Sequence, residues 1–203
     1  YEWFQIASEA SAAQIVFAGC RFFLAGIMVI FFGSLSSGRF LRPEGIQWKH
    51  AAVISLFQTI LQYILFYIGL AHTAGTKASI IVGANVFIAI LTASLIFRQE
   101  KLTGEKILGC LGGFAGVVLI NMTPGGISMH VSFMGEGLVL LSTVAYAFSS
   151  VIMKDYSKTD HPVMLSGYQF FIGGIVMIAV GTAMGGSIRI PSVKAFGILA
   201  YLA

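Results

Sequence analysis

Charged residues are scarce in this chain of 203 residues. Lysine, arginine, aspartate and glutamate make up 10% of it, whereas hydrophobic residues make up 57% and the mean hydropathy is +0.90. A soluble domain carries about 25% charged residues, and a folded chain of this size needs a polar shell to face water. The shortage of charge therefore argues against an ordinary soluble domain and predicts a membrane protein.

Motifs typical of enzymes and of nucleotide-driven pumps are also missing. The sequence contains no G-x-S-x-G, no H-E-x-x-H and no phosphate-binding glycine loop. The only cysteines, Cys20 and Cys110, lie in apolar runs, where we expect small buried hydrophobic residues and not a disulfide. No histidine or cysteine spacing is typical of a metal site. We therefore expect no enzyme, no metal and no cofactor.

Acidic residues are absent from the interior of the apolar runs, since all eight lie near the ends of runs or in loops. A proton relay through carboxylates inside the membrane is therefore not supported. The net charge is +4, but the basic residues are scattered in short loops, so no nucleic-acid partner is expected. We use the basic residues as information on topology.

Long apolar runs are what the sequence does contain. A membrane-spanning helix needs about 20 apolar residues, and continuous runs without in–out alternation favour helices over a β-barrel. The fold class predicted is an all-α polytopic membrane protein with about six complete transmembrane helices. Their expected ranges are Ala12–Leu35, Ala51–Ala71, Ala78–Phe97, Ile107–Met122, Gly137–Met153 and Val163–Met184. A seventh run begins at Ala195.

The loops alternate in positive charge. Eight lysines and arginines lie in the first set of loops, which are residues 36–50, 98–106 and 154–162. Only three lie in the loops of the opposite side, which are residues 72–77, 123–136 and 185–194. Because cytoplasmic loops are enriched in positive residues, the first set is predicted to face the cytoplasm, which places the start of the chain outside.

One phrase occurs twice. AGCRFFLAGIMVIFFG (18–33) returns as SGYQFFIGGIVMIAVG (166–181), with seven of sixteen residues identical. The copies fall in the first and sixth predicted helices, which cross the membrane in opposite directions. Duplicated units of inverted topology are typical of secondary transporters. Chance similarity between helices rich in glycine, phenylalanine and isoleucine is the alternative.

The chain resembles the EamA-type members of the drug/metabolite transporter superfamily. The resemblance rests on RFFLAG (21–26), on the stretch 71–121 with its Glu100–Thr103 turn, and on GEGLVLLSTVAYAFSSVIMK (135–154). It implies a ten-helix protein made of two inverted five-helix repeats in a cell membrane, such as the bacterial cytoplasmic membrane. Residues 1–123 would then be the first repeat without its first helix. Residues 124–203 would be the start of the second, with most of the last three helices absent.

Arg21 is the one charged residue in the apolar run 18–33 and the first candidate for a functional role. An arginine at the centre of a membrane helix costs about 2.5–3.5 kcal/mol on insertion scales. It is therefore expected to pair, or to face a polar cavity in which its guanidinium can hold a carboxylate. A structural bond to a neighbouring helix is the alternative. Gln169 stands in the place of Arg21 in the second copy of the phrase.

Polar side chains recur on the other predicted helices. Ser55, Gln58 and Gln62 share one helical face, and Asn85 lies where many relatives of this type carry a proline. The alternative is that such residues form hydrogen bonds between helices. The predicted substrate pathway consists of Arg21, Gln58, Gln62, Asn85, Tyr146 and Gln169.

Glycines in GCLGGFAG (109–116) form two overlapping small-xxx-small patterns, Gly109 with Gly113 and Gly112 with Gly116. Such patterns allow close helix packing. Packing within the bundle is favoured over a homodimer face.

The function predicted is secondary transport of small metabolites, such as amino acids or related amphipathic compounds, by alternating access in the lipid bilayer. An exchanger of phosphorylated or nucleotide-linked sugars is one alternative, although it would need several cationic residues and only Arg21 is visible. A non-transporting membrane sensor or scaffold is the other.

Overall fold

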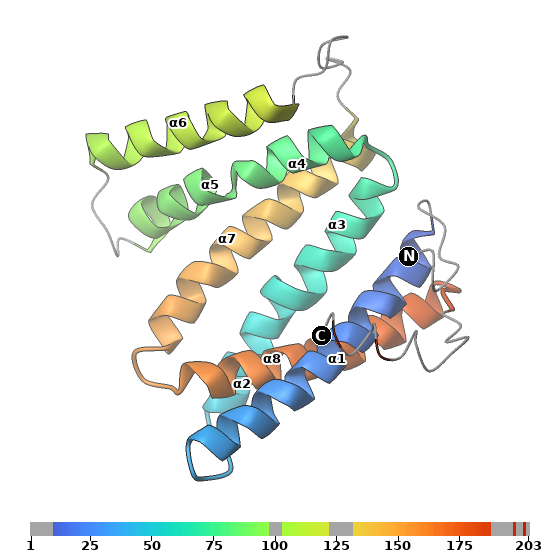
Figure 1. Ribbon diagram of the computed structural model, residues 1–203, viewed down its shortest axis with the longest axis vertical. Helices are drawn as coiled ribbons and strands as arrows, with labels where there is room; N and C mark the ends of the chain where they lie inside the picture. Colours follow the sequence, from blue (N-terminus) through green and yellow to red (C-terminus); the bar gives the residue numbers. More distant parts are fainter. Residues whose placement is uncertain (1–9, 98–102, 122–131, 188–196, 198–200, 202–203) are drawn as a thin grey trace.

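The computed structural model describes residues 10–97, 103–121, 132–187, 197 and 201 (Figure 1). Regular structure within these residues is helical throughout, without a strand, so the prediction of an all-α membrane protein is confirmed. Among the described residues, five helical segments are long and apolar enough to cross a bilayer: Ser11–Ser36, Gln47–Leu70, Gly75–Ile96, Phe133–Tyr156 and Pro162–Ala183. Each coincides with a predicted span.

Three of these spans are not uniform α-helices. The second contains α2 (Gln47–Ile54), a π-helical segment (Ser55–Leu61) and α3 (Gln62–Leu70), and the third contains α4 (Gly75–Gly83), α5 (Asn85–Leu91) and a second π-helical segment (Thr92–Ile96). The fourth consists of a π-helical turn (Phe133–Gly137) followed by α7 (Leu138–Tyr156). The outer two are single helices, α1 (Ser11–Ser36) and α8 (Pro162–Ala183).

The remaining predicted span, Ile107–Met122, corresponds to α6 (Gly104–Asn121). This helix is not among the five candidate spans of the described residues. It lies beside α4 and α5, on the side away from α7 (Figure 1). The seventh run, from Ala195, lies outside the described residues except for two isolated positions.

The third span is interrupted at Ala84, between α4 and α5. The Ala84 N–H donates to the Ile81 carbonyl, three residues back, and the regular helix resumes at Asn85. The third span therefore has a local break without a proline. Breaks and π-helical segments of this kind are frequent at functional sites in membrane helices.

Helices α1 and α8 lie side by side and antiparallel, in contact along their glycine faces (Figure 1). A Cβ placed on Gly26 would lie 2.5 Å from the backbone nitrogen of Phe171, and one on Gly174 would lie 2.5 Å from that of Phe23. Real Cβ atoms do not approach so closely, so only glycine fits at either position. The repeated phrase is therefore the packing surface between these two helices.

The contacts between α1 and α8 are reciprocal. Gly26 and Gly174 are equivalent positions of the repeat, 148 residues apart. Gly26 contacts Phe171, Gly174 contacts Phe23, and these two phenylalanines are also equivalent positions. Phe22 stacks on Phe170 and Phe23 on Phe171, each ring on its own counterpart, with centroids 5.5 Å and 5.2 Å apart. A local two-fold axis therefore passes between these rings. A local two-fold symmetry of this kind is expected of an inverted duplication.

The α1–α2 and α7–α8 connections lie together at one end of the bundle, and the α3–α4 connection lies at the other (Figure 1). The first end carries Arg39, Arg42, Lys49 and Lys158, in agreement with the cytoplasmic side predicted from charge. A core cluster that includes Leu41, Ile54 and Leu165 fixes the α1–α2 connection against α2 and α8.

Candidate functional site: a polar cavity between α3, α4–α5 and α7

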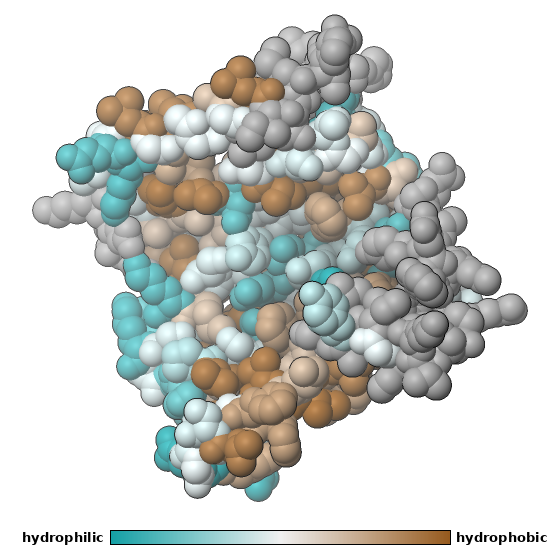
Figure 2. All heavy atoms as spheres, viewed as in Figure 1, coloured by the Kyte–Doolittle hydropathy of each residue, from teal (hydrophilic) through white to brown (hydrophobic). Residues whose placement is uncertain are grey.

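A cavity of about 430 Å³ lies between α3, the α4–α5 break and α7. On the face shown in Figure 2, hydrophilic residues form a band over α3 and α7, between hydrophobic regions over α4–α6 and over α1. The cavity is lined by Gln62, Tyr63, Phe66, Val82, Asn85, Ser142, Thr143 and Tyr146. Three of the six predicted pathway residues, Gln62, Asn85 and Tyr146, are therefore brought together from three separate spans.

The cavity wall offers neutral hydrogen-bonding groups beside aromatic and aliphatic surface. The Oε1 atom of Gln62 and the Oδ1 atom of Asn85 are buried without a hydrogen-bond partner among the described residues. The hydroxyls of Ser142 and Thr143, in contrast, both donate to the Val139 carbonyl of their own helix. Because a buried acceptor without a donor costs about 1–3 kcal/mol, the two amides are poised to accept hydrogen bonds from a ligand or water.

Arg21 lies next to the cavity and not in its wall. Its Cζ atom is 4.9 Å from the centroid of the Phe22 ring, and Phe22 packs edge-on against the cavity residue Tyr63, with centroids 4.6 Å apart. The guanidinium also interacts electrostatically with the Tyr63 side chain. Within the described residues no acid or hydrogen-bond acceptor pairs with Arg21. The cation–π contact with Phe22 is the interaction that stabilises the guanidinium in the described structure.

The other two predicted pathway residues lie outside the cavity wall. Gln169 is only 1% exposed, and Gln58 is half-buried. Each has a side-chain oxygen that is buried and lacks a partner in the described part of the chain. On the neighbouring α8 surface, Gly173 faces Ser55 and Thr59 of the π-helical segment, whose hydroxyls are likewise unpaired. These groups form a second polar layer, between the second span and α8.

Most of the cavity residues that the prediction left out are one helical turn away from a residue that it included, and Tyr63 directly follows Gln62. Phe66 follows Gln62 by four residues, and Val82 precedes Asn85 by three. Residues three and four apart share a helical face. Most of the missed cavity residues could therefore have been found by including the residues three or four positions from each predicted polar residue.

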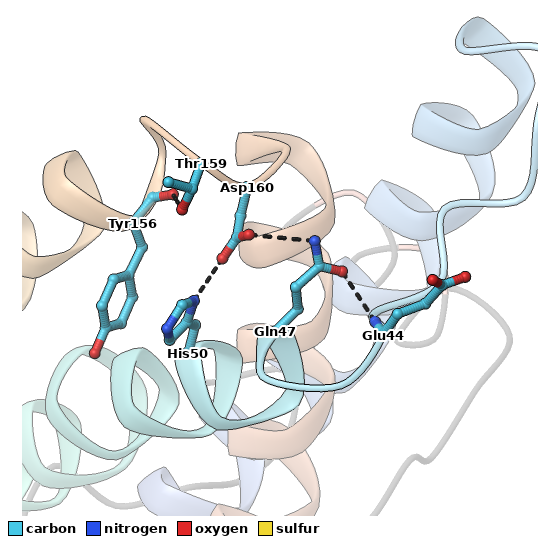
Figure 3. Close-up of polar contacts among 6 residues, drawn as sticks. All are labelled: Glu44, Gln47, His50, Tyr156, Thr159 and Asp160. Atoms are coloured by element: carbon cyan, nitrogen blue, oxygen red, sulfur yellow. Dashed lines mark hydrogen bonds and ion pairs between the residues drawn. The ribbon is translucent and has the colours of Figure 1, made fainter.

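At the end of the bundle predicted to face the cytoplasm, a cluster of polar residues, called the cytoplasmic cluster below, connects α2 with the α7–α8 connection (Figure 3). Asp160, 8% exposed, binds the Nδ1 atom of His50 at 2.5 Å and accepts a hydrogen bond of 3.2 Å from the Gln47 amide. The His50 ring stacks on Tyr156, with centroids 3.9 Å apart. A buried carboxylate is thus satisfied by two side chains that lie more than 100 residues away in the sequence.

An external cluster connects α4 with the start of α7. The Glu136 carboxylate accepts hydrogen bonds from Thr73 at 2.8 Å and from the Lys77 ammonium at 2.9 Å. Its other oxygen accepts the Ser132 N–H at 2.7 Å, and the Ser132 hydroxyl accepts the Gly135 N–H in return. This arrangement resembles a capping box at the start of the span.

The described structure leaves space at the glycines of α6, so the close packing expected of them stays a prediction. A Cβ on Gly109, Gly112, Gly113 or Gly116 would meet no atom within 4 Å in the described structure. Gly109 and Gly113 instead line a groove of about 440 Å³ between α6 and the α4–α5 span, and this space keeps the backbones apart. The close packing expected of α6 is found in α1 and α8.

Comparisons with known proteins agree with the all-α membrane fold. Residues 3–122 and 133–203 match the EamA-like transporter family. A WAT1-related chloroplast protein of Arabidopsis thaliana is 28% identical over 80% of this chain and 39% of its own length. The uncharacterized transporter YyaM of Bacillus subtilis is 25% identical over 92% of this chain and 62% of its own.

The chain spans between about two fifths and three fifths of the length of these relatives. No solved structure gives a significant match. Because the family match extends over both halves of the repeat and most of the described helices, the chain belongs to the EamA-like transporter family, and it is a multi-pass integral membrane protein.

Proposed function

We propose that this chain is part of a secondary transporter that moves small amphipathic metabolites, such as amino acids or related compounds, by alternating access. The observation that carries the proposal is the cavity formed by Gln62, Asn85 and Tyr146. Its neutral donors and acceptors suit the polar groups of a small metabolite, and Tyr63 and Phe66 suit an apolar side chain. Arg21, one aromatic ring away, is positioned to attract a carboxylate.

The two-repeat organisation is part of the same proposal. We assign residues 1–123 to the first repeat and 124–203 to the second, in a ten-helix protein of the bacterial cytoplasmic membrane or its equivalent. The reciprocal packing of α1 on α8 supports this assignment, because inverted repeats place their equivalent helices around a two-fold axis in the membrane plane.

The cytoplasmic and external clusters would act as the closing contacts of the cycle. Each joins a residue of the first proposed repeat to one of the second: His50 to Asp160 on one side, Lys77 to Glu136 on the other. Breaking one cluster while the other holds would open the cavity to one side only. Movements of one repeat against the other around a fixed site are the usual form of alternating access.

Transport by the full-length protein in proteoliposomes tests the proposal. Counterflow of radiolabelled amino acids should depend on the protein and fall about five- to tenfold in the variants Gln62→Ala and Asn85→Ala, since each removes about one ligand hydrogen bond. Thr182→Ala is the matched control, because Thr182 is exposed and bonds only to its own helix. Equal rates in all variants would contradict the assignment of the cavity.

The same vesicles separate the rival functions. Exchange of sugar phosphates in place of amino acids would favour the phosphate-exchanger alternative, for which the described cavity wall has no cationic residue. Absence of flux for either class, with ligand binding retained, would favour a membrane sensor.

A further inference from the structure

We infer that the cytoplasmic end of α1 holds a site for one anionic phospholipid, distinct from the transport cavity. Two pockets meet there. A polar pocket of about 410 Å³ lies between the α1–α2 and α7–α8 connections, and an apolar pocket of about 430 Å³ lies against the last turns of α1. Arg39 and Phe40 line both pockets, so the two form one continuous amphipathic surface.

The polar pocket is suited to a phosphate group. Arg39 and Arg42 provide two guanidinium groups from the α1–α2 connection, and His161 and Thr159 face them from the α7–α8 connection. Guanidinium groups bind phosphate oxygens in a bidentate manner. Glu44 is the one acidic residue of the pocket wall, so the described lining keeps a positive balance.

The loop that carries the arginines is fixed in place. Leu41, 4% exposed, lies between them in the core cluster, and its backbone N–H donates to the Ser34 hydroxyl at 3.0 Å. Pro43 is also buried. Leu41 and Pro43 therefore anchor the backbone on either side of Arg42 and leave the exposed side chains of Arg39 and Arg42 at the pocket. A backbone that is fixed beforehand lowers the entropy lost on binding.

The apolar pocket is suited to an acyl chain. Phe31, Leu35 and Phe40 line it and are 61%, 70% and 70% exposed. They lie at the predicted cytoplasmic boundary of a membrane helix, where lipid chains cover such surfaces. A phosphate beside an acyl chain at this depth is the chemistry of a phospholipid, and the basic loops select the anionic headgroups of the inner leaflet.

Native mass spectrometry of the full-length protein in neutral detergent tests the site. Phosphatidylglycerol should be retained as one molecule per protein in preference to phosphatidylcholine. Arg39→Gln and Arg42→Gln should each lower the retained fraction about fivefold, from the usual contribution of a basic residue near anionic lipid. Lys49→Gln is the matched control, because Lys49 is exposed on the same cytoplasmic side but lines neither pocket.

Two further variants test the direction of the charge effect and distinguish a lipid from a free phosphate ester. Glu44→Gln should raise phosphatidylglycerol binding, since it removes the acid of the pocket. Leu35→Gln should lower lipid binding and leave any binding of glycerol phosphate unchanged. The inference would be overturned if phosphatidylcholine were retained as well as phosphatidylglycerol, or if Lys49→Gln lost as much lipid as the arginine variants. Displacement of the lipid by glycerol phosphate at matched concentration would overturn it too. Transport rates of the cavity variants do not enter this test.

Discussion

The ring of Phe22 stacks on that of Phe170, with an interplanar angle of 7°, although the two residues are 148 positions apart and occupy the same place in the repeated phrase. A residue that contacts its own repeat equivalent must lie on the symmetry axis that relates the copies. The glycine contacts on either side, from Gly19 to Gly181, follow from this axis. They make the α1–α8 interface the most sharply defined part of the structure.

Alanine at Gly26 or Gly174 is expected to destabilise the protein by about 1–3 kcal/mol, the usual cost of overpacking a close contact. The added Cβ would lie 2.5 Å from backbone, which cannot move as a flexible side chain does. Thermal unfolding in detergent measures the effect. Gly112→Ala on α6 is the control, because a Cβ there meets nothing and alanine favours a helix. Equal stability of Gly26→Ala and the control would contradict the packing described.

Asp160→Ala should lower stability by about 1–3 kcal/mol, because His50 and Gln47 lose the acceptor that joins them to the α7–α8 connection. Asp155→Ala is the comparison: its ion pair with Lys158 is about half exposed on both sides, and such pairs contribute little. Unfolding of the two variants in the same detergent gives the difference. If both lose the same stability, the cytoplasmic cluster has no special role.

Charge reversal tests the external cluster. Lys77→Glu places two carboxylates where the ammonium and Glu136 now lie 2.9 Å apart, so transport should fall in this variant. The double variant Lys77→Glu with Glu136→Lys should recover part of the rate, because the attraction returns with opposite polarity. Proteoliposome counterflow measures both. Recovery should be incomplete, since Thr73 and the Ser132 N–H are matched to a carboxylate. A double variant as slow as the single one would count against a pairwise interaction.

Arg21→Lys and Arg21→Gln separate charge from shape. The lysine variant keeps a cation near Phe22 and should retain transport of carboxylate-bearing cargo at a reduced rate. The glutamine variant reproduces the residue at the equivalent position, Gln169, and should lose the preference for carboxylates over their uncharged amides. The measurement is the ratio of the two uptake rates. An unchanged ratio in Arg21→Gln would show that Arg21 serves packing alone.

Five of the six complete spans predicted from the sequence coincide with candidate membrane spans of the described residues, because apolar length depends only on local composition. The site was harder to predict, because a cavity depends on which helix faces meet. Gln62, Asn85 and Tyr146 converge, whereas Gln169 is buried on α8 outside the cavity wall. The π-helical segment beginning at Ser55 changes the helical register there, which a uniform period of 3.6 residues does not anticipate.

The close contacts of the glycines were also hard to predict from the sequence, because they depend on which helix faces meet. Spacing alone favours α6 as much as α1, yet an added Cβ would clash with the opposite backbone at Gly26 and Gly174 and would meet no described atom within 4 Å at the α6 glycines. Gly26 meets the backbone of α8 because Gly174 and Gly167 leave room for it, whereas the α6 glycines have no such counterpart among the described residues.

Arg21 and Gln169 occupy equivalent positions immediately before the two rings on the local axis. In a carrier whose halves exchange shapes during the cycle, identical halves would give the outward-open and inward-open forms equal energy. Each position at which the halves differ removes this degeneracy. The pair Arg21 and Gln169 is one such position, so replacing one residue with the other would shift the resting orientation of the empty carrier.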